Sequence, residues 1–300
     1  MQNEQKCFEK THCDTQCNII DYSRTWSEIM AYSPMGVTVT EVYPKPSKNI
    51  STLQKFFNYN LAENLDSLDL HGPTTVVNCL NPHSFVQALN DDEFRIALEQ
   101  SDVLLPDGEG ICLALKKWGN RTINKIAGDD LHRFLLEKLN NEHGKTNHPA
   151  KVYYMGSSQH VLDLITARLQ REYPAVDVRT WSPSFCEKLS DEESLRIIDD
   201  INSFNPDILF VSMTAPKQEK WVACHRDRLS SPHIIASIGA VFDFYAGTVQ
   251  RAPNWAVQLK IEWLYRLIKE PRRMWERNFV STPKFLHWVY QHRNELKNNI

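Results

Sequence analysis

The 300-residue chain lacks several features that would place it in a common class at once. No run approaches about 18 uninterrupted apolar residues, so the sequence predicts no membrane-spanning helix. The polar start, MQNEQKCFEKTHCDTQ, has no apolar stretch of the kind found in signal peptides, so we expect a cytoplasmic protein with reduced cysteines. The net charge of −3 argues against general binding to nucleic acid.

Three motifs of nucleotide and sugar enzymes are also absent. Neither G-x-G-x-x-G nor G-x-x-x-x-G-K-[ST] occurs, which argues against a dinucleotide fingerprint and a P-loop. No D-x-D occurs, so the usual metal–diphosphate clamp of many sugar transferases is missing, and we predict no metal and no other cofactor. The spacing of Cys7, His12, Cys13 and Cys17 matches no common zinc pattern.

Short apolar stretches alternate with helical patterns from about residue 74 onward. We expect strands at 74–80, 102–105, 151–156, 176–181, 207–213 and 233–239, and helices at 84–100, 109–119, 127–144, 159–173, 191–204 and 216–229. This alternation predicts an α/β fold, a Rossmann-like parallel sheet flanked by helices. We expect a loose extension at 1–35, the Rossmann-like domain at 36–253, and a basic, aromatic-rich helical appendage at 254–300 broken at Pro271 and Pro283.

The stretch LLPDGEG, 104–110, places Asp107 where a predicted strand turns into a helix. In an open parallel sheet, ligands bind beyond the carboxyl ends of the strands. As a turn residue, Asp107 would cap the helix that follows. As a general base, it would accept a proton from an attacking hydroxyl. The residue pattern alone leaves both interpretations open, whereas Glu109, Asp129 and Asp130 suit helix N-termini.

Other strand ends carry residues suited to a ligand: NCLNP, GSSQ and TAPKQEK. In the last of these, the free amides of the first helical turn and Lys217 would suit a diphosphate, although a solvated helix start explains Lys217, Gln218 and Glu219 equally well. The stretch IGAVFDFYAGTVQRAPNW holds Asp243 and Arg251 among aromatic residues, which fits a pocket that stacks a base or a sugar. Core packing explains its phenylalanines better.

The last 45 residues are basic and aromatic. They contain nine Lys or Arg against four Glu, together with Trp263, Trp275, Trp288, Tyr265 and Tyr290. A solvated charged face would explain this composition. So would a segment that closes over a donor and touches an anionic membrane surface.

Seven motifs, in order and at family-like spacing, resemble the bacterial glycosyltransferases of family 26, the teichoic-acid N-acetylmannosaminyltransferase and enterobacterial-common-antigen ManNAcA transferase type. They are LNP, LLPDGEG, IAGDDL, YYMGSS, TAPKQEKW, IGAVFDFYAGTVQRAP and EWLYRLIKEPRRMWERNF. The resemblance runs from about Val37 to Phe279. It implies metal-independent, inverting transfer from a UDP-sugar donor to a polyprenyl-diphosphate-linked saccharide acceptor, with Asp107 as the catalytic base. The implied substrate contacts are Asn81, Gly108, Gly156, Lys217, Gln218, Glu219, Asp243, Arg251, Arg266, Arg273 and Arg277.

Three positions depart from the family pattern. Cys79 stands where many members have the threonine of Thr-x-Asn, Thr214 stands where glycine is common, and Glu276 replaces one of two basic residues. Cys79 puts in doubt the hydroxyl that would face the sugar. Glu276 puts one phosphate contact in doubt.

The resemblance therefore predicts a cytoplasmic enzyme, peripherally associated with the anionic inner face of the plasma membrane, that acts in exopolysaccharide, capsule or other cell-surface glycan biosynthesis. The sugar would be N-acetylmannosamine, its uronic acid or glucose, and the sequence leaves a homo-oligomer open. The alternative from another class is a non-catalytic nucleotide-sugar-binding scaffold of the same pathway. The missing glycine fingerprint disfavours a nucleotide-sugar dehydrogenase or epimerase.

Overall fold

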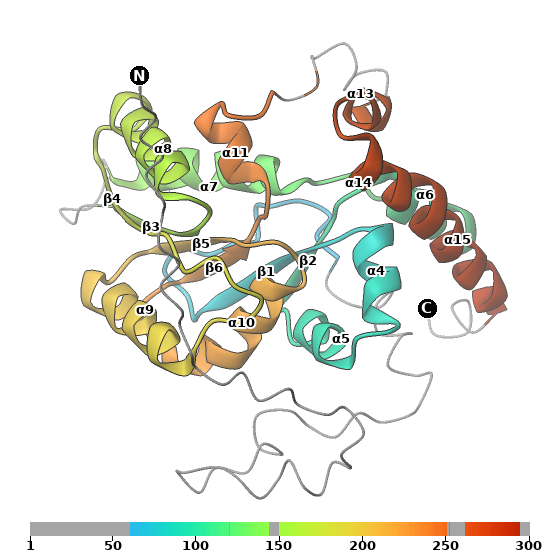
Figure 1. The fold of residues 1–300 in the computed structure, drawn as a ribbon, viewed down its shortest axis with the longest axis horizontal. Helices are drawn as coiled ribbons and strands as arrows, with labels where there is room; N and C mark the ends of the chain where they lie inside the picture. The colour runs from blue at the N-terminus through green and yellow to red at the C-terminus, as the bar shows by residue number, and fades with distance from the viewer. Residues whose placement is uncertain (1–60, 120, 144–149, 251, 253–261, 295–300) are drawn as a thin grey trace, which may run out of the picture. The chain divides into compact units, whose positions relative to one another are not determined.

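Figure 1 shows the computed structural model, which describes residues 61–119, 121–143, 150–250, 252 and 262–294. All of these residues belong to one compact unit, 46–300. At 142, 143, 262, 263 and 273 only the backbone is described. The predicted extension at 1–35, with its cysteines and histidine, lies outside the described residues, and the predicted domain boundaries stay predictions.

Six parallel strands form one sheet in the order β2-β1-β6-β5-β3-β4. Their bounds are β1 Thr75–Leu80, β2 Val103–Pro106, β3 Ala150–Gly156, β4 Val176–Trp181, β5 Ile208–Ser212 and β6 Ile234–Ser237. Each predicted strand agrees with these bounds to within two residues at either end. The Rossmann-like α/β fold is confirmed.

Helices cover both faces of the sheet (Figure 1). One face carries α9 (Asp191–Phe204) and α10 (Lys217–His225), which the short η1 (Arg226–Arg228) follows. The other face carries α7 (Gly128–His143), α8 (Gln159–Glu172) and α11 (Val241–Ala246). A separate apolar cluster joins α4 (Pro82–Ala88), α5 (Asp92–Glu99) and α6 (Glu109–Trp118) to the β1–β2 edge.

The single helix predicted at 84–100 is wrong, because two helices, α4 and α5, occupy that stretch. The chain turns after Ala88, and the side chain of Asp91 then caps α5 by accepting a hydrogen bond from the backbone N–H of Phe94 at 3.0 Å. An aspartate at the N-cap satisfies one of the amides that a helix start leaves unpaired, so it starts a new helix here.

The appendage contains α13 (Glu262–Lys269), α14 (Pro271–Trp275), the π-helical η2 (Glu276–Ser281) and α15 (Thr282–Gln291). The predicted break at Pro271 is confirmed. The break at Pro283 is wrong, because this proline lies in the first turn of α15, where a missing N–H costs little. The ring of Phe285 on α15 lies 5.0 Å from that of Phe85 on α4, so the appendage packs against the sheet domain.

No helix in the described part of the chain combines the length and the apolar character needed to cross a membrane.

Candidate active site

Five neighbouring strand ends bring the predicted site residues to one edge of the sheet. The order β2-β1-β6-β5-β3 places the segments after Pro106, Leu80, Ser237, Ser212 and Gly156 in a row. This is the carboxyl edge, where parallel sheets bind their ligands. Residues more than 100 positions apart in the sequence therefore meet there.

Asp107 lies at the end of β2, beside the start of α4. Its backbone N–H donates to the carbonyl oxygens of Leu80, at 2.9 Å, and Leu105, at 2.8 Å. The N-cap of α6 is Gly108 and not Asp107. Gly108 has a φ of 126°, and a Cβ atom there would lie 3.4 Å from the Cδ atom of Pro82. A glycine at this position lets the loop follow α4 closely.

Asn81, at the end of β1, caps α4. Its Oδ1 accepts hydrogen bonds from the backbone N–H groups of His83, at 3.0 Å, and Ser84, at 2.9 Å. The hydroxyl of Ser84 in turn accepts from the backbone N–H of Asn81 at 2.8 Å. This reciprocal cap fixes the loop beside Asp107. Because Oδ1 is engaged in the cap, a ligand contact by this side chain would use Nδ2.

Gln218 and Glu219, in the first turn of α10, are buried, so a solvated helix start does not describe them. Gln218 Oε1 accepts from the backbone N–H of Met213 at 3.1 Å, and its Nε2 donates to Glu219 Oε1 at 2.8 Å. A Cβ atom on Gly239 would lie 3.9 Å from Gln218 Nε2, which places the amide beside the end of β6. Lys217 behaves differently: its Nζ donates to the carbonyl oxygen of Cys186 at 2.7 Å.

The carboxylates of Asp107 and Glu219 both affect the pKa of the Cys79 thiol. Burial raises the pKa of Cys79 well above its usual value, and the negative charges of Asp107 and Glu219 raise it further. Burial also raises the pKa of Glu219 to about 7, against the opposing effects of the hydrogen bonds from Gln218 and from its own backbone N–H. Cys79 thus lies in the field of both acids, so Asp107 and Glu219 belong to one site. In the sequence, Cys79 is recognisable only as a departure from the Thr-x-Asn pattern of the family.

Gly156, at the end of β3, has a structural reason to be glycine. A Cβ atom there would lie 2.0 Å from the carbonyl oxygen of Ser212, and its φ is 125°. No side chain fits between these two strands. Its contact with a substrate stays a prediction.

The remaining predicted contacts lie on α11 and in the appendage. Asp243 is half-buried on α11, and its carbonyl oxygen accepts from the backbone N–H of Val249 at 3.3 Å. The guanidinium of Arg266 lies 5.6 Å from the ring centre of Phe244, and its Nε is buried without a hydrogen-bond partner among the described residues. Arg251 and the side chain of Arg273 lie outside the described residues.

The appendage reaches the same edge of the sheet through η2. His83 Nδ1 and Ser281 Oγ form a hydrogen bond of 2.8 Å between α4 and η2. A Cβ atom on Gly110 would lie 2.7 Å from Pro82 Cγ and 3.7 Å from Thr282 Cγ2. The segment that carries the half-buried Arg277 is therefore fixed next to the loops of Asn81 and Asp107.

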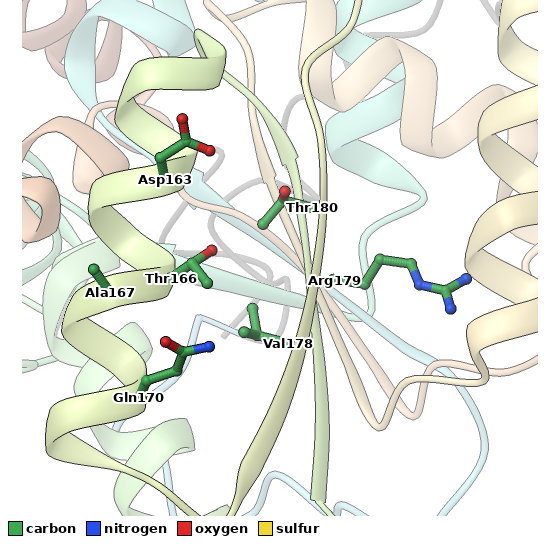
Figure 2. A pocket seen from close by; sticks show the side chains of 7 residues that line it. All are labelled: Asp163, Thr166, Ala167, Gln170, Val178, Arg179 and Thr180. Carbon is green, nitrogen blue, oxygen red and sulfur yellow. The ribbon is translucent and has the colours of Figure 1, made fainter.

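Figure 2 shows a separate hollow of about 520 Å³ between α8 and β4. Its lining residues are Asp163, Thr166, Ala167, Gln170, Val178, Arg179 and Thr180. The side chain of Arg179 points away from α8, and its Nη1 donates to Asp200 on α9 at 3.2 Å. The hollow is open and contains none of the predicted site residues, so we do not assign the chemistry to it.

A metal site of at least three His, Cys, Asp or Glu side chains is not found in the part of the chain that the structure describes. The predicted independence from metal stays a prediction.

Comparison with known proteins places this chain in a family. The sequence matches the family described as "Glycosyl transferase WecG/TagA/CpsF family" over residues 53–299. It is 28% identical to an N-acetylglucosaminyldiphosphoundecaprenol N-acetyl-beta-D-mannosaminyltransferase of Bacillus subtilis (strain 168), over 81% of this chain and 91% of the relative. Proteins of the same name match from Bacillus spizizenii, at 30% identity over 71% of this chain and 77% of the relative, and Staphylococcus aureus (strain MW2), at 27% over 72% and 80%.

The family match covers most of the chain, including every strand of the sheet, the loops at its carboxyl edge and the appendage. The resemblance expected from the seven motifs is confirmed. The chain belongs to the WecG/TagA/CpsF family of glycosyltransferases, and it is a hexosyltransferase.

Proposed function

We propose that the protein transfers N-acetylmannosamine from a UDP-sugar to a polyprenyl-diphosphate-linked saccharide, with inversion, in the synthesis of a cell-surface glycan. The names of the three relatives contain this sugar and an acceptor of this kind, which supports the choice of both. The observation that carries the proposal is the position of Asp107. Its carboxylate lies at the carboxyl edge of the sheet, beside the Asn81 loop and close enough to Cys79 to raise the pKa of the thiol.

In the proposed reaction, Asp107 is the general base. The acceptor hydroxyl oxygen attacks the anomeric carbon of the donor sugar, and the hydroxyl proton passes to the carboxylate of Asp107. The bond between the anomeric carbon and the diphosphate oxygen breaks, and UDP leaves with its electron pair. Attack on the face opposite the leaving group inverts the configuration. A well-placed general base accelerates such a step by about 10²- to 10⁴-fold.

The departing UDP carries negative charge that protein groups would have to balance if no metal takes part. Arg277 is a suitable donor because the Ser281–His83 hydrogen bond ties its segment to the start of α4. Arg266 is another, because its buried Nε has no partner among the described residues. Arg251 and Arg273 stay predicted contacts. Lys217 is the weakest candidate, since its Nζ already donates to Cys186.

The appendage also supports peripheral contact with an anionic membrane at the cytoplasmic face. Its large exposed apolar side chains are Leu264, Ile268, Trp275, Phe279, Val280 and Tyr290. Ile268 is 73% exposed, and the exposed basic residues Lys269 and Arg272 follow it. Apolar side chains that insert between headgroups, flanked by cations worth about 1 kcal/mol each near such a surface, would bring the site to a lipid-linked acceptor.

The proposal is tested by product analysis with purified protein. A panel of UDP-sugars is incubated with a polyprenyl-diphosphate-linked N-acetylglucosamine, and the products are identified by mass spectrometry. We expect addition of one N-acetylhexosamine from UDP-N-acetylmannosamine, with the β configuration verified by NMR. Tight binding of a UDP-sugar with no product from any donor would support the non-catalytic scaffold instead. Transfer of another sugar would show that the donor is not UDP-N-acetylmannosamine.

A further inference from the structure

Beneath the carboxyl edge, three polar side-chain atoms are buried without a hydrogen-bond partner among the described residues. They are Asn78 Oδ1, Ser237 Oγ and Glu219 Oε2. The three residues are at most 3% exposed. A buried polar atom left unsatisfied costs about 1–3 kcal/mol, so three such atoms in one region call for an explanation.

The positions of these residues converge. Asn78 on β1 and Ser237 on β6 are paired in register, so their side chains lie on the same face of the sheet. Two residues earlier on each strand, Val76 and Ile235 pack in one apolar cluster with Val222 of α10.

Glu219 precedes Val222 by three residues, or about one turn of α10. Because α10 connects two parallel strands, it runs antiparallel to them. One helical turn from Val222 toward the start of α10 covers about 5 Å. Two residues from Val76 and Ile235 toward the carboxyl ends of their strands cover about 7 Å in the same direction. This register places Glu219 over the same face of the sheet as Asn78 and Ser237, toward the same strand ends.

The other oxygen of Glu219 connects this cluster to the site. Glu219 Oε1 accepts from Gln218 Nε2 at 2.8 Å, while Gln218 Oε1 accepts from the backbone N–H of Met213 at 3.1 Å. The two ends of the Gln218 amide thus have different partners, which fixes its orientation. That amide lies beside Gly239, at the strand end where the donor sugar is proposed to bind.

Asn78 Oδ1 and an ionised Glu219 Oε2 are both hydrogen-bond acceptors, so they can satisfy each other only through a proton. We propose that Glu219 is a positioning residue that works as the neutral acid: its Oε2–H donates to Asn78 Oδ1 while its Oε1 holds the amide of Gln218 in the sugar-binding site. The hydroxyl of Ser237 supplies a further donor to the same cluster. This inference rests on the proposed sugar transfer for its effect on turnover, but not for the state of the acid.

Other charged and titratable groups lie on the elements packed against α10 or at its ends. They are Cys79 on β1, Asp91 and Glu93 at the start of α5, Asp102 before β2, Asp107 after it, and Lys220, His225 and Arg226 on α10 and η1. Lys220 pairs with Asp91 at 2.8 Å, and Arg226 pairs with Asp102 at 3.1 Å. Burial lowers the pKa of His225 to about 4. Burial also raises the pKa of Glu219 to about 7, which agrees with a neutral acid below neutrality.

The state of the acid is tested by infrared spectroscopy of the protein without substrate. Wild type should show a protonated-carboxyl C=O band near neutral pH that disappears as the pH rises, and Glu219→Gln should lack it. Glu93→Gln is the matched control, because Glu93 is an exposed carboxylate that pairs with α10 through Lys220 at 3.3 Å. A wild-type spectrum without the band below pH 7, or the same band in Glu219→Gln, would overturn the proposal.

The positioning role is tested by kinetics. A glutamine amide can donate to Asn78 and accept from Gln218 as the neutral acid does, so Glu219→Gln should keep at least about tenfold more kcat/KM than Glu219→Ala. We expect the turnover of wild type to decline above pH 7, and Glu219→Gln should lose this decline. Equal kcat/KM in the two variants, or an unchanged alkaline decline in Glu219→Gln, would refute the role. If wild type transfers no sugar, the proposed function fails, while the infrared band still decides the state of Glu219.

Discussion

Replacing Asp107 by Asn tests the chemistry of the site with little change of shape. The backbone at this position is held by hydrogen bonds from its N–H to the carbonyl oxygens of Leu80 and Leu105, and the N-cap of α6 is the neighbouring Gly108. We therefore expect the free energy of unfolding to change by no more than about 1 kcal/mol. An amide cannot accept the hydroxyl proton, so turnover should fall by about 10²-fold or more. That loss corresponds to about 2.7 kcal/mol in the activation barrier.

Three measurements on purified protein separate this effect from others. Initial rates give kcat and KM, calorimetry gives the affinity for UDP, and urea denaturation gives stability. UDP affinity should stay near that of wild type, because in the proposed reaction Asp107 accepts the proton of the attacking hydroxyl and does not bind the nucleotide. Glu109→Gln is the matched control, since Glu109 is an exposed carboxylate two residues further on, in the first turn of α6. Its turnover should stay near that of wild type. Near-normal turnover of Asp107→Asn would refute the assignment of the base.

Four further outcomes follow from the structure. Asp107→Asn should lower the thiol pKa of Cys79, because it removes a nearby negative charge; peptide-resolved alkylation at pH 8 should be faster, and an equal rate would contradict the coupling. Excess EDTA should leave turnover intact, whereas a loss restored by Mg²⁺ or Mn²⁺ would show that the protein uses a metal. Burial raises the pKa of Glu219 from 4.5 to about 7, so its neutral form contributes stability that is present at low pH and lost as the pH rises through that range. In urea titrations at pH 5 and pH 8, the stability of wild type relative to Glu219→Gln should therefore fall by up to about 3 kcal/mol, and a constant difference would exclude the shift. Ile268→Asp should weaken cosedimentation with anionic vesicles and leave turnover on a soluble acceptor analogue unchanged. Unchanged cosedimentation would show that Ile268 of α13 does not contribute to membrane contact.

The sheet could be predicted from the sequence because each strand carries its own local signal. The stretch KVYYMG is short, mostly apolar and ends in a glycine, and it forms β3 within one residue of the prediction. The order of the strands has no such local signal. It depends on pairings such as Val77 with Val103 on one side and with Ala236 on the other, which only the folded chain makes.

The same difference between local signals and long-range contacts explains which parts of the site could be predicted. The position of Asp107 after a strand could be predicted from LLPDGEG, but the role of Cys79 could not, because the two acids that act on it come from β2 and α10. The break between α4 and α5 did have a signal in the sequence, since Asp91 precedes two acids in the manner of a helix start. The amphipathic pattern continues across it and concealed the turn. Lys217 looked available for a diphosphate because its partner, the carbonyl oxygen of Cys186, lies 31 residues away.

The position of β1 in the sheet has a consequence for synthesis of the protein on the ribosome. β1 is made early, but its neighbour β6 begins only at Ile234, and Phe85 receives its aromatic partner Phe285 after 200 more residues. Such distant pairings slow folding, because a long loop must close before they contribute. The β1–β2 pair therefore has an open edge until β6 is made, and its apolar cluster stays uncovered until α15 is made. A nascent chain arrested before Thr282 would expose that cluster, and it should depend on chaperones more than the completed enzyme does.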